Sequence, residues 1–96
     1  MIEIRQTDVF AAWFRNLRDR QVRARIQVRI DRLQLGLAGD ARPVGEGVSE
    51  LRIDCGPGYR VYFVCRGREL IILLAGGNKR TQQRDIKRAI QLASDL

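Results

Sequence analysis

The stretch from residue 50 to residue 85, ELRIDCGPGYRVYFVCRGRELIILLAGGNKRTQQRD, decides the fold of this chain. It predicts three consecutive strands followed by a basic turn that opens a helix. Apolar and polar residues alternate over 51–55, a Cys-Gly-Pro-Gly sequence interrupts the pattern, and the alternation returns over 60–64. Because successive side chains of a strand point to opposite faces of the sheet, we expect one apolar face. The opposite face should carry Arg52, Arg60 and Tyr62.

The turns of this stretch also predict which residues face one another across the strands. The third strand, 70–75, is expected to pair with the second strand, because only the short 66–68 connection separates them. Gly76 and Gly77 should end the third strand and deliver a basic turn to the end of the sheet that carries Arg60. With the first turn centred on residues 56–58, the expected pairs are Ile53–Val61, Arg52–Tyr62, Asp54–Arg60, Val64–Leu70 and Tyr62–Ile72.

The polar face of this predicted sheet has two interpretations. It can be a solvated surface, as in most half-exposed antiparallel sheets. It can instead be an anion site, because arginine presents a planar, permanently charged fork that suits phosphate oxygens. Convergence of Arg60 with Lys79 and Arg80 at one end of the sheet would favour the anion site.

Length and composition predict one domain that spans residues 1–96, since 45% of the 96 residues are hydrophobic. No apolar run reaches the length of a membrane span, and the start, MIEIRQTDVF, lacks a signal-peptide pattern. We therefore expect a soluble cytoplasmic protein with no membrane partner. The formal net charge of +7 favours a polyanionic partner, either nucleic acid or an acidic protein.

Histidine is absent from the sequence, so any acid–base chemistry near neutral pH must use other groups. Cys55 and Cys65 do not have the spacing of metal ligands. We expect both cysteines to be reduced, semi-buried packing residues. We expect neither a bound metal nor a cofactor.

The rest of the chain predicts two helices before the sheet and one after it. An edge strand is expected at 2–5, and Thr7 or Asp8 should cap the first helix. Residues 36–47 are rich in glycine and are expected to form a loop. The strand at 70–74 is apolar on both faces and is therefore expected to be central. Thr81 should cap the last helix, which gives the order β-α-α-β-β-β-α in an α+β domain whose helices pack on one sheet face.

The predicted second helix places its apolar residues, from Val22 through Ile26, Ile30 and Leu33 to Leu37, along one face. Its other faces are rich in arginine, including Arg23. These arginines can form a solvated helical surface, or they can contact RNA or an acidic partner. The sequence leaves both interpretations open.

Three segments of the chain resemble known proteins: G-x-x-E-L-R at 47–52, G-P-G-Y-R-V-Y-F at 56–63, and G-G-N-K-x-T-Q-x-x-D-I at 76–86. With the short first strand and the pair of helices, they resemble toxins of bacterial type II toxin–antitoxin modules. The resemblance is to the RelE/ParE superfamily, and within it to the phage-derived Gp49-like or "addiction module killer protein" branch, close to HigB. It covers essentially the whole chain.

This resemblance implies a toxin that is neutralised by a helix-turn-helix antitoxin. RelE-like members cleave mRNA in the ribosomal A site, using the ribose 2′-OH as nucleophile, whereas ParE-like members inhibit DNA gyrase. The implied function is thus a ribosome-dependent mRNA endonuclease. The alternatives are a gyrase inhibitor that acts by protein–protein binding, and a catalytically degenerate toxin that acts only as corepressor with its antitoxin.

The resemblance also implies roles for individual residues. Arg60 matches the arginine thought to stabilise the transition state, and Arg80, next to Lys79, matches a second basic residue of RelE-like sites. The family's tyrosine near position 86 and its histidine are both missing, so proton transfer would fall to Lys79, Tyr62, Asp54 or ribosomal RNA. The predicted catalytic residues are Arg60, Lys79 and Arg80, and the predicted RNA-binding residues are Arg52, Tyr62, Arg84 and Arg23.

Overall fold

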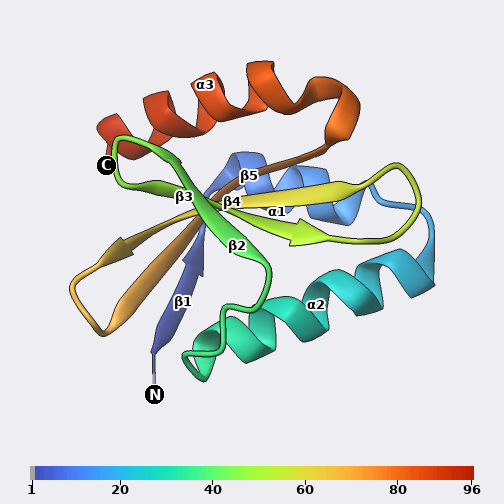
Figure 1. Ribbon diagram of the computed structural model, residues 1–96, viewed down its shortest axis with the longest axis horizontal. Coiled ribbons are helices and arrows are strands. Elements are labelled where there is room, and N and C mark those ends of the chain that lie inside the picture. Colours follow the sequence, from blue (N-terminus) through green and yellow to red (C-terminus); the bar gives the residue numbers. More distant parts are fainter. Residues whose placement is uncertain (1) are drawn as a thin grey trace.

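The computed structural model describes residues 2–96, which form one α+β domain (Figure 1). The predicted order of elements is confirmed, with one additional strand inserted before the predicted hairpin. The elements are β1 (Glu3–Gln6), α1 (Asp8–Arg15), α2 (Arg20–Gln34), β2 (Ala41–Gly45), β3 (Val48–Ile53), β4 (Tyr59–Arg66), β5 (Leu70–Asn78), the 3-10 turn η1 (Lys79–Thr81) and α3 (Gln82–Ser94).

The five strands form one sheet in the order β1-β5-β4-β3-β2. β1 is an edge strand and β5 lies between β1 and β4, as predicted. β1 pairs with β5 in parallel, while all the other neighbours are antiparallel. Among residues 2–96, no helix has the length and apolar composition that crossing a bilayer would require.

β2 is a strand where the sequence predicted only a loop. It pairs antiparallel with β3 at the second edge of the sheet. An edge position accommodates Pro43, because the ring then removes no hydrogen bond from an inner ladder. The Arg29 side chain of α2 supports the approach to β2 by donating hydrogen bonds to the carbonyls of Ala38 and Asp40, at 3.1 and 3.2 Å. The strand therefore depends on tertiary contacts that its own composition does not indicate.

The predicted register of the β3–β4 hairpin is wrong. The observed partners are Leu51–Val61, Arg52–Arg60 and Ile53–Tyr59. The turn covers residues 54–58 and is centred one residue earlier than predicted. The Gly58 N–H donates to the Cys55 carbonyl, and Gly56 and Gly58 both have positive φ. Arg52 and Arg60 are consequently direct neighbours.

The predicted register of β4 against β5 is also wrong, and β5 is longer than expected. The strand continues through Gly76 and Gly77 to Asn78, and a bulge between Tyr62 and Phe63 shifts the pairing. The observed partners include Arg60–Gly77, Tyr62–Ala75 and Val64–Ile72.

The two glycines allow other elements to approach β5 closely. A Cβ atom at Gly76 would overlap the ring of Trp13 in α1, and one at Gly77 would overlap the carboxylate of Asp85 in α3. Adjacent residues of a strand face opposite ways, so α1 and α3 meet β5 from different sides here. Gly76 and Gly77 are thus strand residues at which the packing leaves no room for a side chain.

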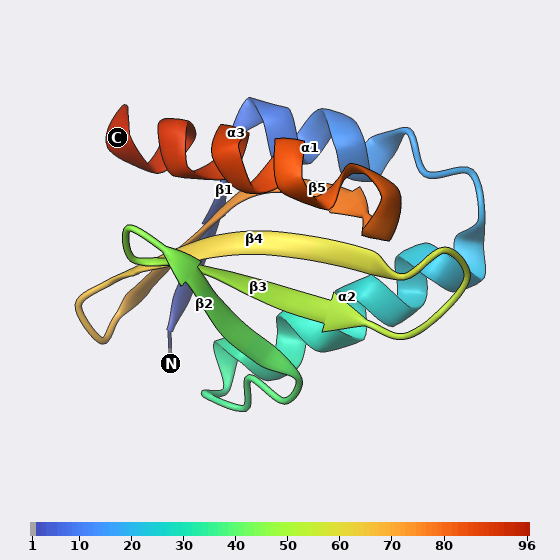
Figure 2. The same cartoon turned by 45° about the horizontal axis from the view of Figure 1, so that its top comes forward.

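Helices lie on both faces of the sheet, which corrects the expectation of one covered face. Figure 2 shows α2 below the sheet and α3 above it. One core cluster joins α2 to one face through Ile26, Ile30, Leu51 and Phe63. The other joins α3 to the opposite face. Leu37, the last apolar position predicted for α2, lies beyond the helix and is 60% exposed.

α1 lies beside the second half of β5, beyond the last β1–β5 pair, Gln6–Leu73. In this position it contributes Phe10 to the α2-side cluster and Val9 to the α3-side cluster. Thr7 caps α1 as predicted, since its hydroxyl accepts a hydrogen bond from the Phe10 N–H at 3.1 Å.

The start of α3 is built differently from the prediction. Thr81 makes no side-chain cap to α3; instead Asn78 caps η1, and its side chain accepts from the Arg80 N–H at 2.9 Å. Cys55 and Cys65 are both free, as expected, but Cys65 is exposed and not semi-buried.

Candidate anion-binding site

A hollow of about 260 Å³ lies at the end of the sheet where β3 ends and β4 begins. We call it the sheet-end hollow. Two arginines, one lysine and two aspartates line it, so the formal charge of the lining side chains is positive. Its lining residues are Asp40, Arg52, Asp54, Gly58, Arg60 and Lys79.

The pairing of β3 with β4 brings two of the cations together. Arg52 and Arg60 are cross-strand partners, so their side chains share one face of the sheet. The Arg52 Nε lies 3.6 Å from Oδ2 of Asp40, the residue that precedes β2. Both partners of this ion pair are well exposed, so it contributes little to stability but biases Arg52 toward the hollow.

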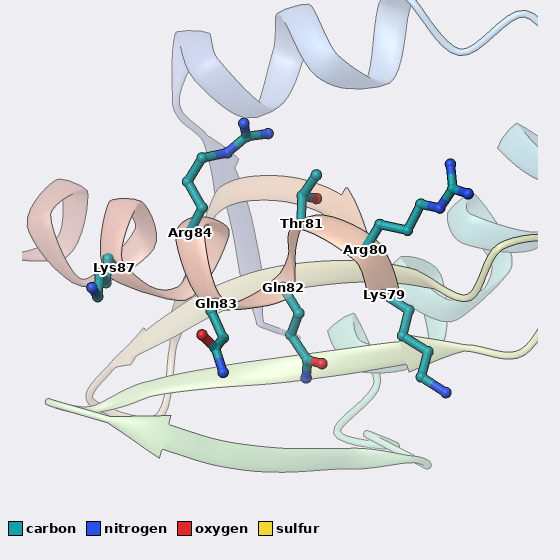
Figure 3. A pocket seen from close by; sticks show the side chains of 7 residues that line it. All are labelled: Lys79, Arg80, Thr81, Gln82, Gln83, Arg84 and Lys87. Atoms are coloured by element: carbon teal, nitrogen blue, oxygen red, sulfur yellow. The ribbon is translucent and has the colours of Figure 1, made fainter.

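Lys79 reaches the hollow from η1, the turn that follows β5. Its N–H donates to the Pro57 carbonyl at 3.4 Å, which joins η1 to the β3–β4 turn. Gly58, at φ +78°, leaves room between the strands: a Cβ there would lie 3.5 Å from Lys79 Cβ and 3.7 Å from Arg60 Nη1. Figure 3 shows the Lys79 side chain extending toward the end of β3. Arg52, Arg60 and Lys79 therefore converge, as the sequence predicted.

Arg80 does not join them. In Figure 3, Arg80 and Arg84 project from η1 and α3 in the direction opposite to the Lys79 side chain. They line a second, open hollow, which we call the α3 surface; its residues are Lys79, Arg80, Thr81, Gln82, Gln83, Arg84 and Lys87. The predicted cluster of Arg60, Lys79 and Arg80 is thus divided between two adjoining surfaces that share only Lys79.

Arg60 is nearly buried, at 9% exposure, and its charge is compensated inside the protein. Its Nε lies 3.1 Å from Oε1 of Glu50, a β3 carboxylate with 0% exposure. The contact is an ion pair without aligned hydrogen-bond geometry, since within residues 2–96 neither atom has a hydrogen-bond partner. Glu50 also accepts a hydrogen bond from Gln82 Nε2 at 2.8 Å, and Arg42 Nε lies 3.8 Å away.

Tyr62 belongs to the core and not to the hollow. It is fully buried between the sheet and α3, and its hydroxyl has no hydrogen-bond partner within residues 2–96. Burial, together with the negative charges of Glu50 and Asp85, raises the pKa of the Tyr62 hydroxyl far above its ordinary value. A buried, protonated phenol can neither stack on a base nor exchange protons in the hollow, which corrects the predicted RNA-binding role of Tyr62.

Arg23 lies apart from both hollows. It is a half-buried residue of α2, the helix on the face opposite α3, and it lines neither the sheet-end hollow nor the α3 surface. Arg23 is therefore not part of the lining that Arg52 and Arg60 share, although it was predicted to bind RNA together with Arg52.

Three residues that support the site were missed from the sequence. Glu50 had a signal: it precedes Arg52 by two positions and so shares its face of β3. Asp40 lay in the presumed loop and gave no signal. Arg29 resembled the other arginines of α2, yet its Nη1 donates to the Arg52 carbonyl at 2.5 Å and so fixes the end of β3 from beneath.

The hollow has the chemistry of a phosphate site. Arginine forks and a lysine bind phosphate oxygens, and both kinds of group line a concave surface here. The nearby carboxylates, Asp40 and Asp54, are exposed. Position 86 on α3 is an isoleucine, so this helix presents no tyrosine there for proton transfer.

Two comparisons with known proteins identify relatives of this chain. A protein of Haemophilus influenzae (strain ATCC 51907 / DSM 11121 / KW20 / Rd), described as an "Uncharacterized protein", is 47% identical over 95 residues, which cover 99% of this chain and 96% of that protein. The family model described as "Phage derived protein Gp49-like (DUF891)" matches residues 12–96. That range includes every residue of the sheet-end hollow and of the α3 surface. The chain therefore belongs to the phage-derived Gp49-like family.

Proposed function

We propose that this protein is the toxin of a type II toxin–antitoxin system and that it cuts mRNA on the ribosome. The observation that carries the proposal is the convergence of Arg52, Arg60 and Lys79 on one concave surface. Attack of a ribose 2′-OH on its phosphodiester builds negative charge on the phosphorane-like transition state. Fixed cations in a partly desolvated hollow stabilise such charge more than they stabilise the ground state.

The proposed roles follow from the position of each side chain. Arg60, the most buried cation, would bind the phosphorane oxygens, and Lys79 would contact the scissile phosphate from η1. Arg52 would hold the adjacent phosphate. Arg80 and Arg84 on the α3 surface would contact the flanking backbone of mRNA or ribosomal RNA. Arg23, on the opposite side of the sheet, would contact RNA only at a distance from the cleavage site.

Proton transfer would depend on the ribosome. The sequence has no histidine, and Tyr62 is sealed in the core, so the hollow offers Lys79 and two exposed carboxylates. A cleavage that requires ribosomal RNA groups accounts for a site rich in cations and poor in acid–base residues.

The test is to express the protein in the cytoplasm without an antitoxin and to sequence RNA 5′ ends. The proposal predicts new ends inside translated coding regions. Lys79→Ala should remove these ends, because it removes the proposed contact with the scissile phosphate. Lys79 is exposed, so this truncation should leave the fold intact. Arg68→Ala is the matched control, since Arg68 is an exposed residue of the β4–β5 turn at the other end of the sheet.

Arg60 requires a different substitution. Arg60→Ala would leave the buried Glu50 carboxylate without its nearest cation, and the resulting loss of stability would be confused with loss of catalysis. Arg60→Lys keeps a charge beside Glu50 and removes the planar fork. This variant should remain folded and should produce no new RNA ends. Wild-type levels of cleavage by Arg60→Lys or Lys79→Ala would contradict the assigned roles.

A second candidate function is inhibition of DNA gyrase, as in ParE-like proteins. The poverty of acid–base groups at the hollow favours it, because a protein–protein inhibitor needs none. It predicts induction of the DNA-damage response with intact mRNA, so the same sequencing experiment separates the two. A third outcome, normal growth together with tight antitoxin binding, would identify the protein as a corepressor only.

We further propose that the partner is a helix-turn-helix antitoxin, which binds through an acidic amphipathic segment. A groove on α2, the α2 groove, offers an apolar floor with arginines at its border. Its exposed large apolar residue is Val28, at 46% exposure. The groove is lined by Ala24, Arg25, Val28, Arg29, Arg32, Ile53 and Asp54. Such a surface suits a helix with one apolar and one acidic face.

A further inference from the structure

We propose that Glu50 is a positioning residue: through its ion pair with the Nε atom it holds the Arg60 guanidinium so that Nη1 lies toward the sheet-end hollow. This inference deepens the proposed function, because it names a residue that acts on the phosphate only through Arg60. Glu50 itself is 0% exposed and cannot touch a substrate in the hollow.

The geometry of Arg60 supports this assignment. A guanidinium offers an Nε edge and a terminal fork formed by its two Nη atoms. Glu50 lies 3.1 Å from Nε, whereas Nη1 lies on the side of Gly58, which lines the hollow. The carboxylate therefore lies close to Nε as an ion-pair partner, without an aligned Nε–H hydrogen bond. Nη1 of the fork, which can bind a phosphate oxygen, is left on the side of the hollow.

Glu50 also connects Arg60 to the start of α3, which directly follows the turn that carries Lys79. Gln82 is the first residue of α3, directly after η1, and its amide donates to Glu50 Oε2 at 2.8 Å. One buried carboxylate thus contacts β4 through Arg60 and the start of α3 through Gln82. A shift of Glu50 would disturb both cationic sides of the hollow at the same time.

Removing the Glu50 charge distinguishes a positioning role from simple charge neutralisation, because the two roles predict opposite changes in the cleavage rate. If Glu50 only reduced the charge of Arg60, Glu50→Gln would make the hollow more positive, and both phosphate binding and cleavage would strengthen. If Glu50 positions Arg60, Glu50→Gln should bind RNA as well as wild type or more tightly and yet cleave more slowly. A role in folding alone would weaken both together.

The experiment compares wild type with Glu50→Gln, Glu50→Asp and the control Glu69→Gln. Glu50→Asp retains the buried charge and withdraws the carboxylate by one methylene, so it tests position even if Glu50→Gln does not fold. Glu69 is an exposed residue of the β4–β5 turn, remote from the hollow. Binding is measured by titrating a 2′-O-methyl RNA trinucleotide, which cannot be cleaved, and cleavage is measured on mRNA-programmed ribosomes.

We expect both Glu50 variants to lower kcat by about tenfold to a hundredfold, the effect of misplacing a catalytic group by a fraction of a bond length to about 1 Å. The Kd for the trinucleotide should stay equal or fall. Glu69→Gln should change neither quantity. Cleavage by Glu50→Gln at or above the wild-type rate would overturn the proposal, as would parallel losses of binding, cleavage and thermal stability in Glu50→Asp.

A third measurement keeps this inference separate from the nuclease proposal. In a ¹⁵N NMR spectrum, the Arg60 Nε–Hε signal is assigned as the one lost in Arg60→Lys. Glu50→Asp should shift it and speed its exchange with water, whether or not the protein cleaves RNA. An unchanged signal would overturn the positioning role. If Glu50→Asp changes the signal although the wild-type protein cleaves no RNA, the coupling between Glu50 and Arg60 is retained and only the nuclease proposal is rejected.

Discussion

Arg52 and Arg60 face each other across the β3–β4 ladder, so two like charges lie side by side at the end of the sheet. Like charges in direct cross-strand positions destabilise a sheet. Carboxylates lie beside each arginine, Asp40 near the first and Glu50 near the second, and they offset part of the repulsion. The arrangement trades some stability for two guanidinium groups held side by side, and such local compromises are typical of functional sites.

Arg52→Gln should therefore stabilise the protein slightly while weakening the site. Removing one of two facing charges relieves repulsion worth a few tenths of a kcal/mol to about 1 kcal/mol. The same change removes a phosphate ligand from the hollow, so affinity for single-stranded RNA should fall. Urea unfolding and RNA titration of the same preparation measure both effects. A variant that is less stable and binds RNA equally well would contradict the trade.

Arg29→Gln should loosen β2 and the end of β3. Arg29 donates to three backbone carbonyls, and hydrogen bonds from a charged donor contribute about 1.5–3 kcal/mol each when solvent does not replace them. Arg29 is half-buried, so we expect a total loss of about 2 kcal/mol in urea unfolding. Hydrogen exchange should increase in β2 first. Arg25→Gln, a change at an exposed position of the same helix, is the control and should leave both measurements unchanged.

Gly77→Ala should destabilise the junction of β5 with α3. The added methyl group would overlap the Asp85 carboxylate, which already forms a hydrogen bond with the Thr81 hydroxyl. Overpacking of this kind costs about 1–3 kcal/mol. In thermal unfolding, the double variant Gly77→Ala/Asp85→Ala should be more stable than the sum of the single effects predicts, because the second change removes the overlapping group. If the two single effects on stability are additive in the double variant, the methyl group at position 77 and the Asp85 side chain are not in contact.

Tyr62→Phe should be neutral or stabilising near neutral pH and should change the alkaline stability profile. The buried Tyr62 hydroxyl has no partner within residues 2–96, so its removal recovers a desolvation cost of about 1 kcal/mol. In the wild type, raising the pH above the ordinary tyrosine pKa of about 10 ionises Tyr62 only in the unfolded state. The free energy of unfolding is therefore unaffected by this ionisation below that pH, and above it the ionisation lowers the free energy of unfolding by roughly 1.4 kcal/mol per pH unit. Urea unfolding at pH 8 to 11 should show a shallower decline in Tyr62→Phe; equal slopes would contradict the prediction.

Val28→Asp should prevent antitoxin binding at the α2 groove without affecting RNA cleavage. Val28 is the exposed large apolar residue of the groove, and an aspartate there would repel an acidic partner as well as remove apolar contact. Isothermal titration with the cognate antitoxin should show at least about a tenfold loss of affinity, the effect of losing roughly 1.4 kcal/mol. The protein should stay toxic when expressed alone. Unchanged affinity would place the partner elsewhere.

Elements with a strong apolar period were predictable from the sequence, and elements fixed by distant contacts were not. The central position of β5 followed from apolar residues on both of its faces, and the Thr7 cap followed from residue type. β2 has the sequence ARPVG, which carries no strand pattern, and it forms because β3 and Arg29 support it. Both hairpin registers were wrong because a glycine-rich turn and a β-bulge shift the pairing without changing the alternation.

The site was predictable only in part for the same reason. Alternation placed Arg52 and Arg60 on one face, and the chain order brought Lys79 to the same end of the sheet. Alternation could not show that α3 covers this face, and that cover is what buries Tyr62 and Glu50. Nor could it show that η1 points consecutive residues, Lys79 and Arg80, in different directions.

The parallel pairing of β1 with β5 has a consequence for the timing of folding. The Thr7 hydroxyl donates to the Leu74 carbonyl at 2.6 Å, although 67 positions separate the two residues in the chain. Contacts so remote in sequence form late and slow the folding of a small domain. During translation, β1 therefore remains without its partner strand until β5, which immediately precedes Lys79, has been made. The proposed activity can arise only after this pairing, which gives a neutralising partner made at the same time an interval in which to be ready.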